Sequence, residues 1–301
     1  DGTIYQAVDF NGDGISDIVK IYSEYFKNGN NFYDNSKYDI AIFLSQNNGV
    51  YADTTVYEDI RTIGSLFETS IDFHGQSIVD FDGDGISDIL VPTTEFKKAP
   101  YTSVISLDLI LGKDIVSKRR HIQQYSFPLS SSADSIFFVS GDINDDDKDE
   151  FIYFENKLNN NSKCIGKIVT YNAGNFSLTD LFLTMPYSPK KGIISDFNNN
   201  GLSDLILFHE KGYCIFFNKG ADNINGIFDS EPSYKHYSND NFSRWETCDM
   251  NGDGLVDFVS TSEQGKKLVV HYNQGNGTFR KEIQDLDLSQ NTSTEQDFFR
   301  H

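Results

Sequence analysis

Cysteine is too scarce in this chain to build a disulfide framework or a zinc site. The 301 residues include three cysteines, Cys164, Cys214 and Cys248, which stand far apart. None forms a C-x-x-C pair, and no histidine lies at zinc-ligand spacing from them. An odd number also excludes complete pairing into disulfides. Because cysteine packs readily as a small apolar residue, we expect these three to be buried free thiols.

Positive charge is also sparse. Lys and Arg number 25 against 45 Asp and Glu, which gives a formal net charge of −20 at pH 7. Nucleic acid is therefore not an expected partner, because phosphate contacts need clustered basic side chains. The one basic cluster, Lys113 to His121, is short, and we expect a solvated loop there. An excess of acidic residues can serve solubility or can bind cations. The placement of the carboxylates along the sequence distinguishes these two explanations.

Long apolar runs and catalytic signatures are missing as well. No run approaches the ~20 residues that cross a bilayer, so direct membrane insertion is not expected. The chain opens abruptly at Asp1, and this segment shows no signal peptide. The G-x-S-x-G, H-E-x-x-H, phosphate-loop and dinucleotide-binding motifs are absent, which favours a protein that is not an enzyme. We expect five scattered histidines to be surface or packing residues: His74, His121, His209, His236 and His271.

One nine-residue pattern, D-x-[ND]-x-[DN]-x-x-x-[DE], occurs five times along the chain. The copies read DFNGDGISD from Asp9, DFDGDGISD from Asp80, DINDDDKDE from Asp142, DFNNNGLSD from Asp196 and DMNGDGLVD from Asp249. Successive copies start 71, 62, 54 and 53 residues apart. A repeat of this period indicates one structural unit copied five times.

Each copy offers oxygen ligands for a hard cation such as Ca²⁺. Side-chain oxygens stand at positions 1, 3, 5 and 9, and the backbone carbonyl of position 7 can complete the set. Position 6 needs a sharp turn with positive φ. It is Asp147 in the third copy and glycine in the others, namely Gly14, Gly85, Gly201 and Gly254. Fifteen carboxylates occupy the ligand positions and would repel one another without cations.

The sequence around each copy predicts strands rather than the helices of an EF-hand. An EF-hand requires Glu at position 12. That position holds Lys20, Val91, Tyr153, Leu207 and Ser260. A strand-like run follows each copy, and a second β-rich run then closes with a Gly-Asn turn and an aromatic residue, as in LVVHYNQGNGTF. Each unit thus holds about four strands, which is the content of a propeller blade.

We therefore predict an all-β fold, a β-propeller with about five visible four-stranded blades. The cation loop is expected between the first and second strands of each blade. A single domain is expected over residues 1–301, with repeats at about 1–60, 61–130, 131–185, 186–238 and 239–301. The number of blades in the full protein stays open. Residues 1–4 look like the tail of a preceding turn, so the full protein can hold six or seven blades.

The D-x-[DN]-x-D-G-x-x-D loop with a later G-N-G-x-F turn resembles the FG-GAP and VCBS repeats. This family is known from the calcium-binding propellers of integrin α-chains and from bacterial surface and secreted proteins. The resemblance covers nearly the whole chain. It implies three to five Ca²⁺ ions and a secreted or cell-surface protein, with the propeller segment of a bacterial toxin-complex or Rhs-type protein as one form.

The same resemblance implies a ligand set for each loop. The fourth loop has only two carboxylates, so we expect it to bind Ca²⁺ most weakly; the third departs at position 6 and carries the longer Glu150. The ligands, loop by loop, are Asp9, Asn11, Asp13, Ile15 (carbonyl) and Asp17; Asp80, Asp82, Asp84, Ile86 (carbonyl) and Asp88; Asp142, Asn144, Asp146, Lys148 (carbonyl) and Glu150; Asp196, Asn198, Asn200, Leu202 (carbonyl) and Asp204; and Asp249, Asn251, Asp253, Leu255 (carbonyl) and Asp257.

Recognition is expected at the blade ends opposite the cation loops. Two segments there read as long loops, Tyr22–Tyr38 and Thr93–Ser103. Their aromatic residues suit a sugar or protein surface. These residues are Tyr22, Tyr25, Phe26, Tyr33, Tyr38, Phe96 and Tyr101. The first hypothesis is accordingly a module for protein or glycan recognition or for scaffolding. Two alternatives stay open: a carbohydrate-active enzyme resembling polysaccharide lyases on the same kind of propeller, and a structural propeller of a toxin-complex or Rhs shell.

Overall fold

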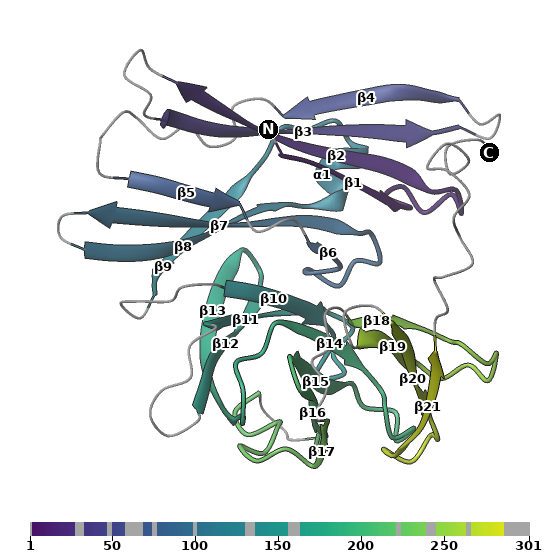
Figure 1. Ribbon diagram of the computed structural model, residues 1–301. Helices are drawn as coiled ribbons and strands as arrows, with labels where there is room; N and C mark the ends of the chain where they lie inside the picture. The colour runs from purple at the N-terminus through teal and green to yellow at the C-terminus, as the bar shows by residue number, and fades with distance from the viewer. Residues whose placement is uncertain are drawn as a thin grey trace, which may run out of the picture. The chain divides into compact units, whose positions relative to one another are not determined.

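The chain forms antiparallel β-sheets, each built from strands that follow one another in sequence (Figure 1). The computed structural model describes residues 2–27, 33–46, 50–57, 69–73, 77–98, 101–129, 136–155, 163–220, 224–238, 245–262 and 266–285; some strand-end side chains within these ranges are not described. No helix among these residues is both long and apolar enough to cross a bilayer.

Five sheets occur in chain order, and each lies within the residues of one sequence repeat. The first contains β1 (Gly2–Val8), β2 (Asp17–Lys27), β3 (Tyr33–Ser45) and β4 (Tyr51–Tyr57). In the second, β5 (Thr69–Phe73) and β6 (Ser77–Val79) both pair with β7 (Asp88–Lys98), followed by β8 (Tyr101–Ile110) and β9 (Gln123–Pro128).

The remaining three sheets keep the simple order of four strands. The third contains β10 (Ile136–Gly141), β11 (Glu150–Glu155), β12 (Lys163–Asn172) and β13 (Asn175–Thr184). The fourth contains β14 (Lys191–Ser195), β15 (Asp204–His209), β16 (Gly212–Phe216) and β17 (Tyr234–Tyr237). The fifth contains β18 (Trp245–Cys248), β19 (Asp257–Ser262), β20 (Lys267–Asn273) and β21 (Phe279–Asp285).

Inner strands such as β11, β15 and β16 are buried on both faces of their sheets, whereas outer strands such as β9 and β17 alternate in burial. Every residue of β11, β15 and β16 is buried, whereas β17 alternates between partly buried and exposed residues. A strand reads as a continuous apolar run when both faces of its sheet are covered. The runs FIYF in β11 and LILF in β15 therefore indicate that both faces of their sheets are covered.

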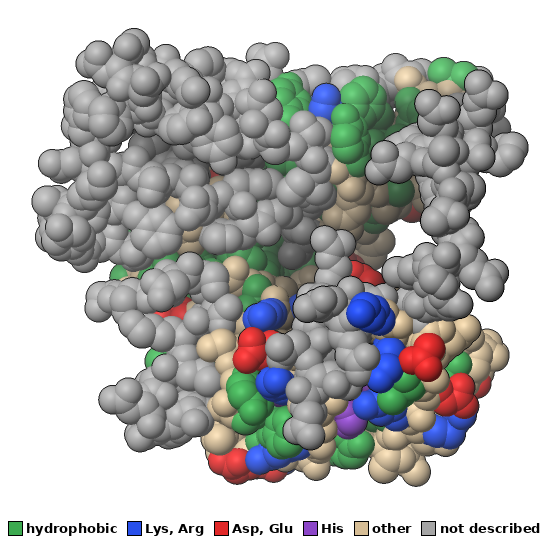
Figure 2. All heavy atoms as spheres, viewed as in Figure 1, with side chains coloured by type: hydrophobic (Ala, Val, Ile, Leu, Met, Phe, Trp, Pro, Cys, Tyr) green, Lys and Arg blue, Asp and Glu red, His purple; other side chains and the backbone are tan. Residues whose placement is uncertain are grey.

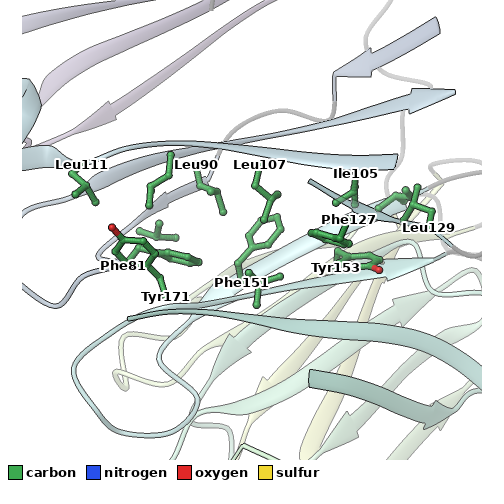
Figure 3. Packing of buried hydrophobic residues seen from close by; sticks show 14 residues of the cluster. Phe81, Leu90, Ile105, Leu107, Leu111, Phe127, Leu129, Phe151, Tyr153 and Tyr171 are labelled. Carbon is green, nitrogen blue, oxygen red and sulfur yellow. The ribbon is translucent and has the colours of Figure 1, made fainter. Parts of the chain in front are cut away.

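Apolar side chains fill the space between neighbouring sheets of one compact unit, as between the second and third sheets (Figure 3). Leu90 and Leu107 of the second sheet pack with Phe151, Tyr153 and Tyr171 of the third. A second cluster joins the first sheet to the second, and a third cluster joins the fourth to the fifth through Phe208 and Phe258, among others. Four-stranded antiparallel sheets stacked face to face are the blades of a β-propeller. The predicted fold class is confirmed.

The contacts within the chain define two compact units. One comprises Asp1–Lys157 with Gly166–Asp180, and the other comprises Leu158–Ile165 with Leu181–His301. The first unit holds the first two blades and most of the third, and the second unit holds the fourth and fifth. The expectation of one domain over the whole chain stays a prediction.

Three segments expected as loops have regular structure over part of their length. Part of the basic run from Lys113 to His121 forms a short helix, α1 (Gly112–Val116), because its N–H groups bond to the Leu111 carbonyl and Ile115 is fully buried in the core. The supposed loops Tyr22–Tyr38 and Thr93–Ser103 lie largely in strands, since β2 and β3 pair as far as Lys27 and Tyr33, and β7 and β8 as far as Lys98 and Tyr101.

The cysteines are free, but one of them is not buried. Cys164 and Cys214 are buried as expected, whereas Cys248 is exposed. Cys248 is the last residue of β18, where burial alternates along the strand, and its sulfur lies 3.1 Å from the sulfur of Met250. The expectation of three buried thiols was wrong for Cys248 because its position on an outer strand turns it toward solvent.

Replacing Phe258 should weaken the core between the fourth and fifth blades. The Phe258 ring is fully buried and lies 4.7 Å from the Phe279 ring and 5.2 Å from the Phe208 ring, centroid to centroid. Phe258→Ala should cost about 3–5 kcal/mol of unfolding free energy through lost burial and the cavity left behind. Urea unfolding measures this. Phe182→Ala, at a side chain that is 49% exposed, is the control and should change stability by less than about 0.5 kcal/mol.

Candidate functional site

The five aspartate loops all lie between the first and second strands of a blade, at one end of each sheet. They occupy residues 9–16, 80–87, 142–149, 196–203 and 249–256. The residue at position 6 has positive φ in every loop, between +80° and +85° for the glycines and +63° for Asp147. The third loop therefore keeps the same turn although a side chain must adopt a conformation that favours glycine.

The first carboxylate of each loop accepts backbone N–H groups from inside the loop. Asp9 Oδ1 accepts from Gly12 at 2.8 Å, and Oδ2 accepts from Gly14 at 2.8 Å. Asp249 makes the equivalent bonds to Gly252 and Gly254. These backbone hydrogen bonds, that of Gly14 or Gly254 most of all, lower the pKa of both carboxyl groups. The loop is thus folded around an ionised carboxylate.

The carboxylate at position 9 is buried and joins the loop to a distant part of the blade. Asp257 is fully buried; its Oδ2 accepts the N–H of Met250 at 2.9 Å and its Oδ1 accepts the N–H of Asn273 at 2.8 Å. In the other blades that have this pair of bonds, the second N–H also comes from the end of the third strand or just beyond it. The pairs are Phe10 and Ser45 on Asp17, Phe81 and Gly112 on Asp88, and Phe197 and Asn218 on Asp204.

Sequence analysis missed these second partners, although a signal was present. Asn218 and Asn273 each begin an N-x-G turn, in which the asparagine side chain accepts the N–H of Gly220 or Gly275 at 2.9 Å. The same asparagine therefore starts the turn with its side chain and holds the position-9 carboxylate with its backbone. The Gly-Asn turn was identified as a turn, but its link to the aspartate loop depends on folding.

Burial raises the pKa of several position-9 carboxyl groups. Removal from water is the largest cause in each case, and the pKa reaches about 7 for Asp88, about 8 for Glu150 and about 6 for Asp204. Neighbouring carboxylates of the same loops raise these values further. A cation within the loop would oppose both effects and favour the charged form.

In three loops, position 3 supplies a buried oxygen that has no hydrogen-bond partner among the residues the structure describes. These atoms are Oδ1 of Asp82, Asn144 and Asn198. In the first and fifth loops the Asn11 and Asn251 oxygens instead accept the N–H of position 5, at 2.9 and 3.0 Å. A buried oxygen without a partner costs about 1–3 kcal/mol, which coordination of a cation would offset.

The second loop has the acidic grouping most suited to a metal ion. One ligand atom from each of Asp80, Asp82 and Asp88 lies within 4.8 Å of the others. Among the described residues this is the only set of three acidic, histidine or cysteine side chains with that spacing. All donors are oxygens, which is the preference of Ca²⁺ rather than of zinc or copper. The residues present therefore fit a calcium ion.

The aromatic residues expected to form a ligand face are described only in part. Tyr22 is partly buried on β2, and the Lys20 ammonium lies 5.0 Å from the centroid of its ring. The other six belong to β2, β3, β7 or β8, but their side chains lie outside the described residues: Tyr25, Phe26, Tyr33, Tyr38, Phe96 and Tyr101. Their proposed role stays a prediction.

The structure reveals a different aromatic cluster, at the end of the fourth blade opposite its aspartate loop. It consists of Tyr187, His209 and Tyr237. His209 ends β15 and Tyr237 ends β17, roughly 17 Å along the strand direction from Asp204 at ~3.3 Å per residue. Figure 2 shows acidic, basic and apolar side chains intermixed on the viewed surface of this part of the chain, without a patch of one charge.

Gly212 allows His209 and Tyr237 to meet across an intervening strand. His209 pairs with Gly212 and Gly212 pairs with Tyr237, so the two side chains lie two strands apart, where backbones are roughly 9.5 Å apart. No side chain separates them, and their ring centroids lie 5.8 Å apart. A Cβ on Gly212 would clash with the His236 carbonyl oxygen, so this position requires glycine.

The cluster combines exposed rings with a buried polar group. Tyr187 is 38% exposed and Tyr237 is 47% exposed, whereas His209 is 1% exposed. Burial lowers the pKa of His209 to about 4, with His236 as a lesser cause, so the ring is neutral at pH 7. His209 Nδ1 accepts the Lys211 N–H at 3.2 Å, which leaves the proton on Nε2, and Nε2 has no hydrogen-bond partner within the described residues.

The remaining histidines pack or pair. His271 Nδ1 lies 3.0 Å from the Tyr213 hydroxyl in the core between the fourth and fifth blades, and its ring stacks edge to face on His236 at 4.6 Å. His121 lies 3.0 Å from the Asp114 carboxylate. His74 lies outside the described residues.

Comparison with known proteins supports the fold and leaves the family undetermined. No family model matches the chain. No curated protein matches it either. A solved lectin from Agrocybe aegerita, described as recognising non-reducing terminal N-acetylglucosamine, is 18% identical with a TM-score of 0.54. The alignment covers 94% of this chain and 65% of the lectin, so the chain spans less than two thirds of that protein.

A second structure is more distant. The exotype rhamnogalacturonan lyase YesX is 10% identical with a TM-score of 0.46, and the alignment covers 92% of this chain and 49% of the lyase. At 18% identity the lectin likeness establishes the fold alone. The chain is therefore similar to a lectin in its β-propeller fold, and its own activity must be argued from its residues.

The position-9 bonds predict that this carboxylate stabilises the blade even without a metal ion. In Asp257→Asn, an NH₂ group must face one of the two buried N–H donors, which should cost about 1–3 kcal/mol. Asp253→Asn is the matched control, because this exposed carboxylate can still accept the Leu255 N–H as an amide. Both variants are unfolded with urea in a buffer containing a chelator. Equal stabilities of the two variants would contradict the structural role of Asp257.

Proposed function

We propose that this chain is a calcium-stabilised β-propeller that recognises carbohydrate and is not an enzyme. The observation that carries the recognition proposal is the exposed Tyr187–Tyr237 pair packed on the buried His209 ring, whose Nε2 has no hydrogen-bond partner among the described residues, at the blade end away from the aspartate loops. The fold likeness to a lectin that recognises N-acetylglucosamine supports the choice of carbohydrate over protein. If no glycan binds, a protein becomes the expected ligand of this surface.

Calcium is proposed for the loops on the basis of their donors. Three buried oxygens at position 3 lack partners, and buried carboxylates at position 9 have raised pKa values, both of which a divalent cation would correct. Five ions would halve the formal charge from −20 to about −10. Membership of the FG-GAP and VCBS repeats and a secreted or cell-surface location belong to the same proposal, because the aspartate loops resemble those repeats.

The aromatic cluster suits a sugar because it is flat, rigid and partly polar. Tyr187 stands between Pro186 and Pro189, which restrict the backbone of its loop, and the Lys190 N–H bonds to the Phe208 carbonyl at 2.8 Å. Tyrosine rings offer contact area at a small entropic cost, and their hydroxyl groups can bond sugar hydroxyls. Preorganisation of this kind lowers the cost of binding.

A non-enzymatic role fits the chemistry of this cluster. His209 is neutral and buried, and burial raises the pKa of the nearby Cys214 thiol to about 11, so neither a general acid nor a thiolate nucleophile forms at neutral pH. Tyr237 adds a hydroxyl 3.9 Å from the Cys214 sulfur, and burial raises its pKa as well. These groups are suited to contact rather than to proton transfer.

Calcium titration tests the metal part of the proposal. Isothermal titration of chelator-treated protein should show three to five Ca²⁺ per chain, and the melting temperature should rise, since each ion at 100 times its Kd adds about 2.7 kcal/mol to stability. Asp146→Asn should remove or weaken one site. Asp145→Asn, the same change at a neighbouring residue that is not a proposed ligand, should not. An absence of both binding and thermal shift would refute the calcium assignment.

Glycan binding tests the recognition part. The chain is screened on an array of neutral glycans and then titrated with the best hit, with N-acetylglucosamine as the first soluble probe. Tyr187→Ala and Tyr237→Ala should each weaken binding at least about tenfold, because each removes a principal contact ring. Phe182→Ala removes an equally exposed ring from β13 and should leave binding unchanged. Loss of binding in the control, or none in the tyrosine variants, would exclude this cluster as the site.

A further inference from the structure

A cavity of about 300 Å³ lies between the second and third blades, at the end that carries their aspartate loops. Its walls are Asp82 of the second loop, Lys113 of α1, Lys148 of the third loop, and the β12–β13 turn from Tyr171 to Gly174. All of these residues belong to the first compact unit. The cavity is therefore a feature of two packed neighbouring blades, whereas Tyr187 and Tyr237 belong to the other compact unit.

The two loops that frame the cavity are fixed to each other. The N–H of Asp149 donates to the Asp80 carbonyl at 2.8 Å, and the N–H of Asp80 donates to Asp149 Oδ2 at 2.8 Å. Gly83 leaves room for the Lys148 stem, since a Cβ there would lie 2.8 Å from Lys148 Cγ. Two reciprocal hydrogen bonds and this close approach hold the cavity walls in place.

The cavity presents two ammonium groups and one incompletely satisfied carboxylate. The Lys113 ammonium contacts Asp82 Oδ2, while Asp82 Oδ1 is buried and has no hydrogen-bond partner within the described ranges. The Lys148 ammonium forms no ion pair within the described part of the chain, although its backbone carbonyl belongs to the third loop's predicted ligand set. Two lysines from adjacent blades at one small cavity indicate an anionic ligand.

The surrounding carboxylates make this anion site depend on the metal ion. Asp80, Asp82 and Asp84 lie in the same loop and would repel an anion while the loop is empty of cations. Calcium would neutralise these carboxylates. It would also coordinate Asp82, so that the ion pair between Asp82 and Lys113 would no longer be required to balance the charge of Asp82. The Lys113 ammonium would become available to the cavity beside Lys148.

We propose that this cavity binds the charged unit of an acidic saccharide, with its carboxylate or sulfate group between Lys113 and Lys148, when the second loop holds Ca²⁺. The proposal rests on the calcium part of the proposed function and assigns a second, separate site. A volume near 300 Å³ is at the small end of ligand pockets and suits one or two sugar rings. The Asn172 amide and the backbone of Ala173 and Gly174 supply polar partners for hydroxyl groups.

The test compares one acidic disaccharide with its uncharged counterpart. The whole chain is titrated calorimetrically with a glucuronate-containing disaccharide and with the carboxyl-reduced form of the same disaccharide, in calcium and in a chelator. The acidic form should bind in calcium at least about tenfold more tightly than in the chelator, and more tightly than the reduced form. Inorganic sulfate, titrated in calcium, should bind much more weakly if the sugar ring contributes.

Variants connect this binding to the two lysines. Lys148→Ala and Lys113→Ala should each weaken the acidic disaccharide at least about tenfold, and Lys148→Arg should retain part of the affinity. Lys219→Ala is the matched control: it removes the same charge from a lysine of the fourth blade, which pairs with Asp229 at 2.6 Å, and should leave binding unchanged. Circular dichroism and calcium titration of each variant establish that the fold and the ions are retained.

The failure of this proposal is distinct from the failure of the proposed function. If calcium binds and the Tyr187 and Tyr237 variants lose neutral glycan, but the acidic disaccharide does not bind or binds equally to Lys148→Ala, the cavity assignment is wrong and the proposed function stands. Equal binding of inorganic sulfate and of the disaccharide would reduce the cavity to a simple anion site and overturn the saccharide assignment. An absence of calcium binding would overturn the metal dependence together with the calcium proposal.

Discussion

The buried carboxylate at the ninth position of each aspartate loop is the interaction on which each blade depends. In every blade the third strand must align with the first two strands. The residues that connect these strands differ from one blade to the next. In four blades one carboxylate bonds two backbone N–H groups, one at the start of the loop and one at the end of the third strand or just beyond it. Because these N–H groups are buried, losing their acceptor would cost more than the bond itself contributes.

This arrangement links the metal loops to the fold. Besides its ninth carboxylate, each loop gathers four further oxygens. In three loops the position-3 oxygen is buried and has no partner among the described residues, and burial raises the pKa of the ninth carboxyl group in three blades. Close packing of like-charged oxygens is unfavourable unless a cation is added, whereas the backbone geometry is already formed by hydrogen bonds to the first carboxylate. A preformed loop would bind a cation without a large ordering cost, and a bound cation would in turn stabilise the blade.

The two ends of a blade have different physical constraints. The loop end is dense in hydrogen bonds and carboxylates, so its chemistry favours cations. Beside Lys113 and Lys148, bound cations would in turn allow an anion to bind. The opposite end of the fourth blade has exposed aromatic rings over a neutral histidine. Under the two proposals, the ligands at these ends would differ in charge and in their dependence on calcium.

The sequence alone determined the blades and the position of their loops, because both follow from local patterns. An apolar run such as LILF in β15, an aspartate repeat and a glycine at a positive φ each act within a few residues. Only the tertiary structure decided which distant groups meet. The bond from Asn273 to Asp257, the approach of His209 to Tyr237 over Gly212, the contact of Lys113 with Asp82 and the exposure of Cys248 all depend on how strands pair and sheets stack. No local sequence pattern shows these features. They are set by strand register and by packing between blades, which bring together residues that are separated in the sequence.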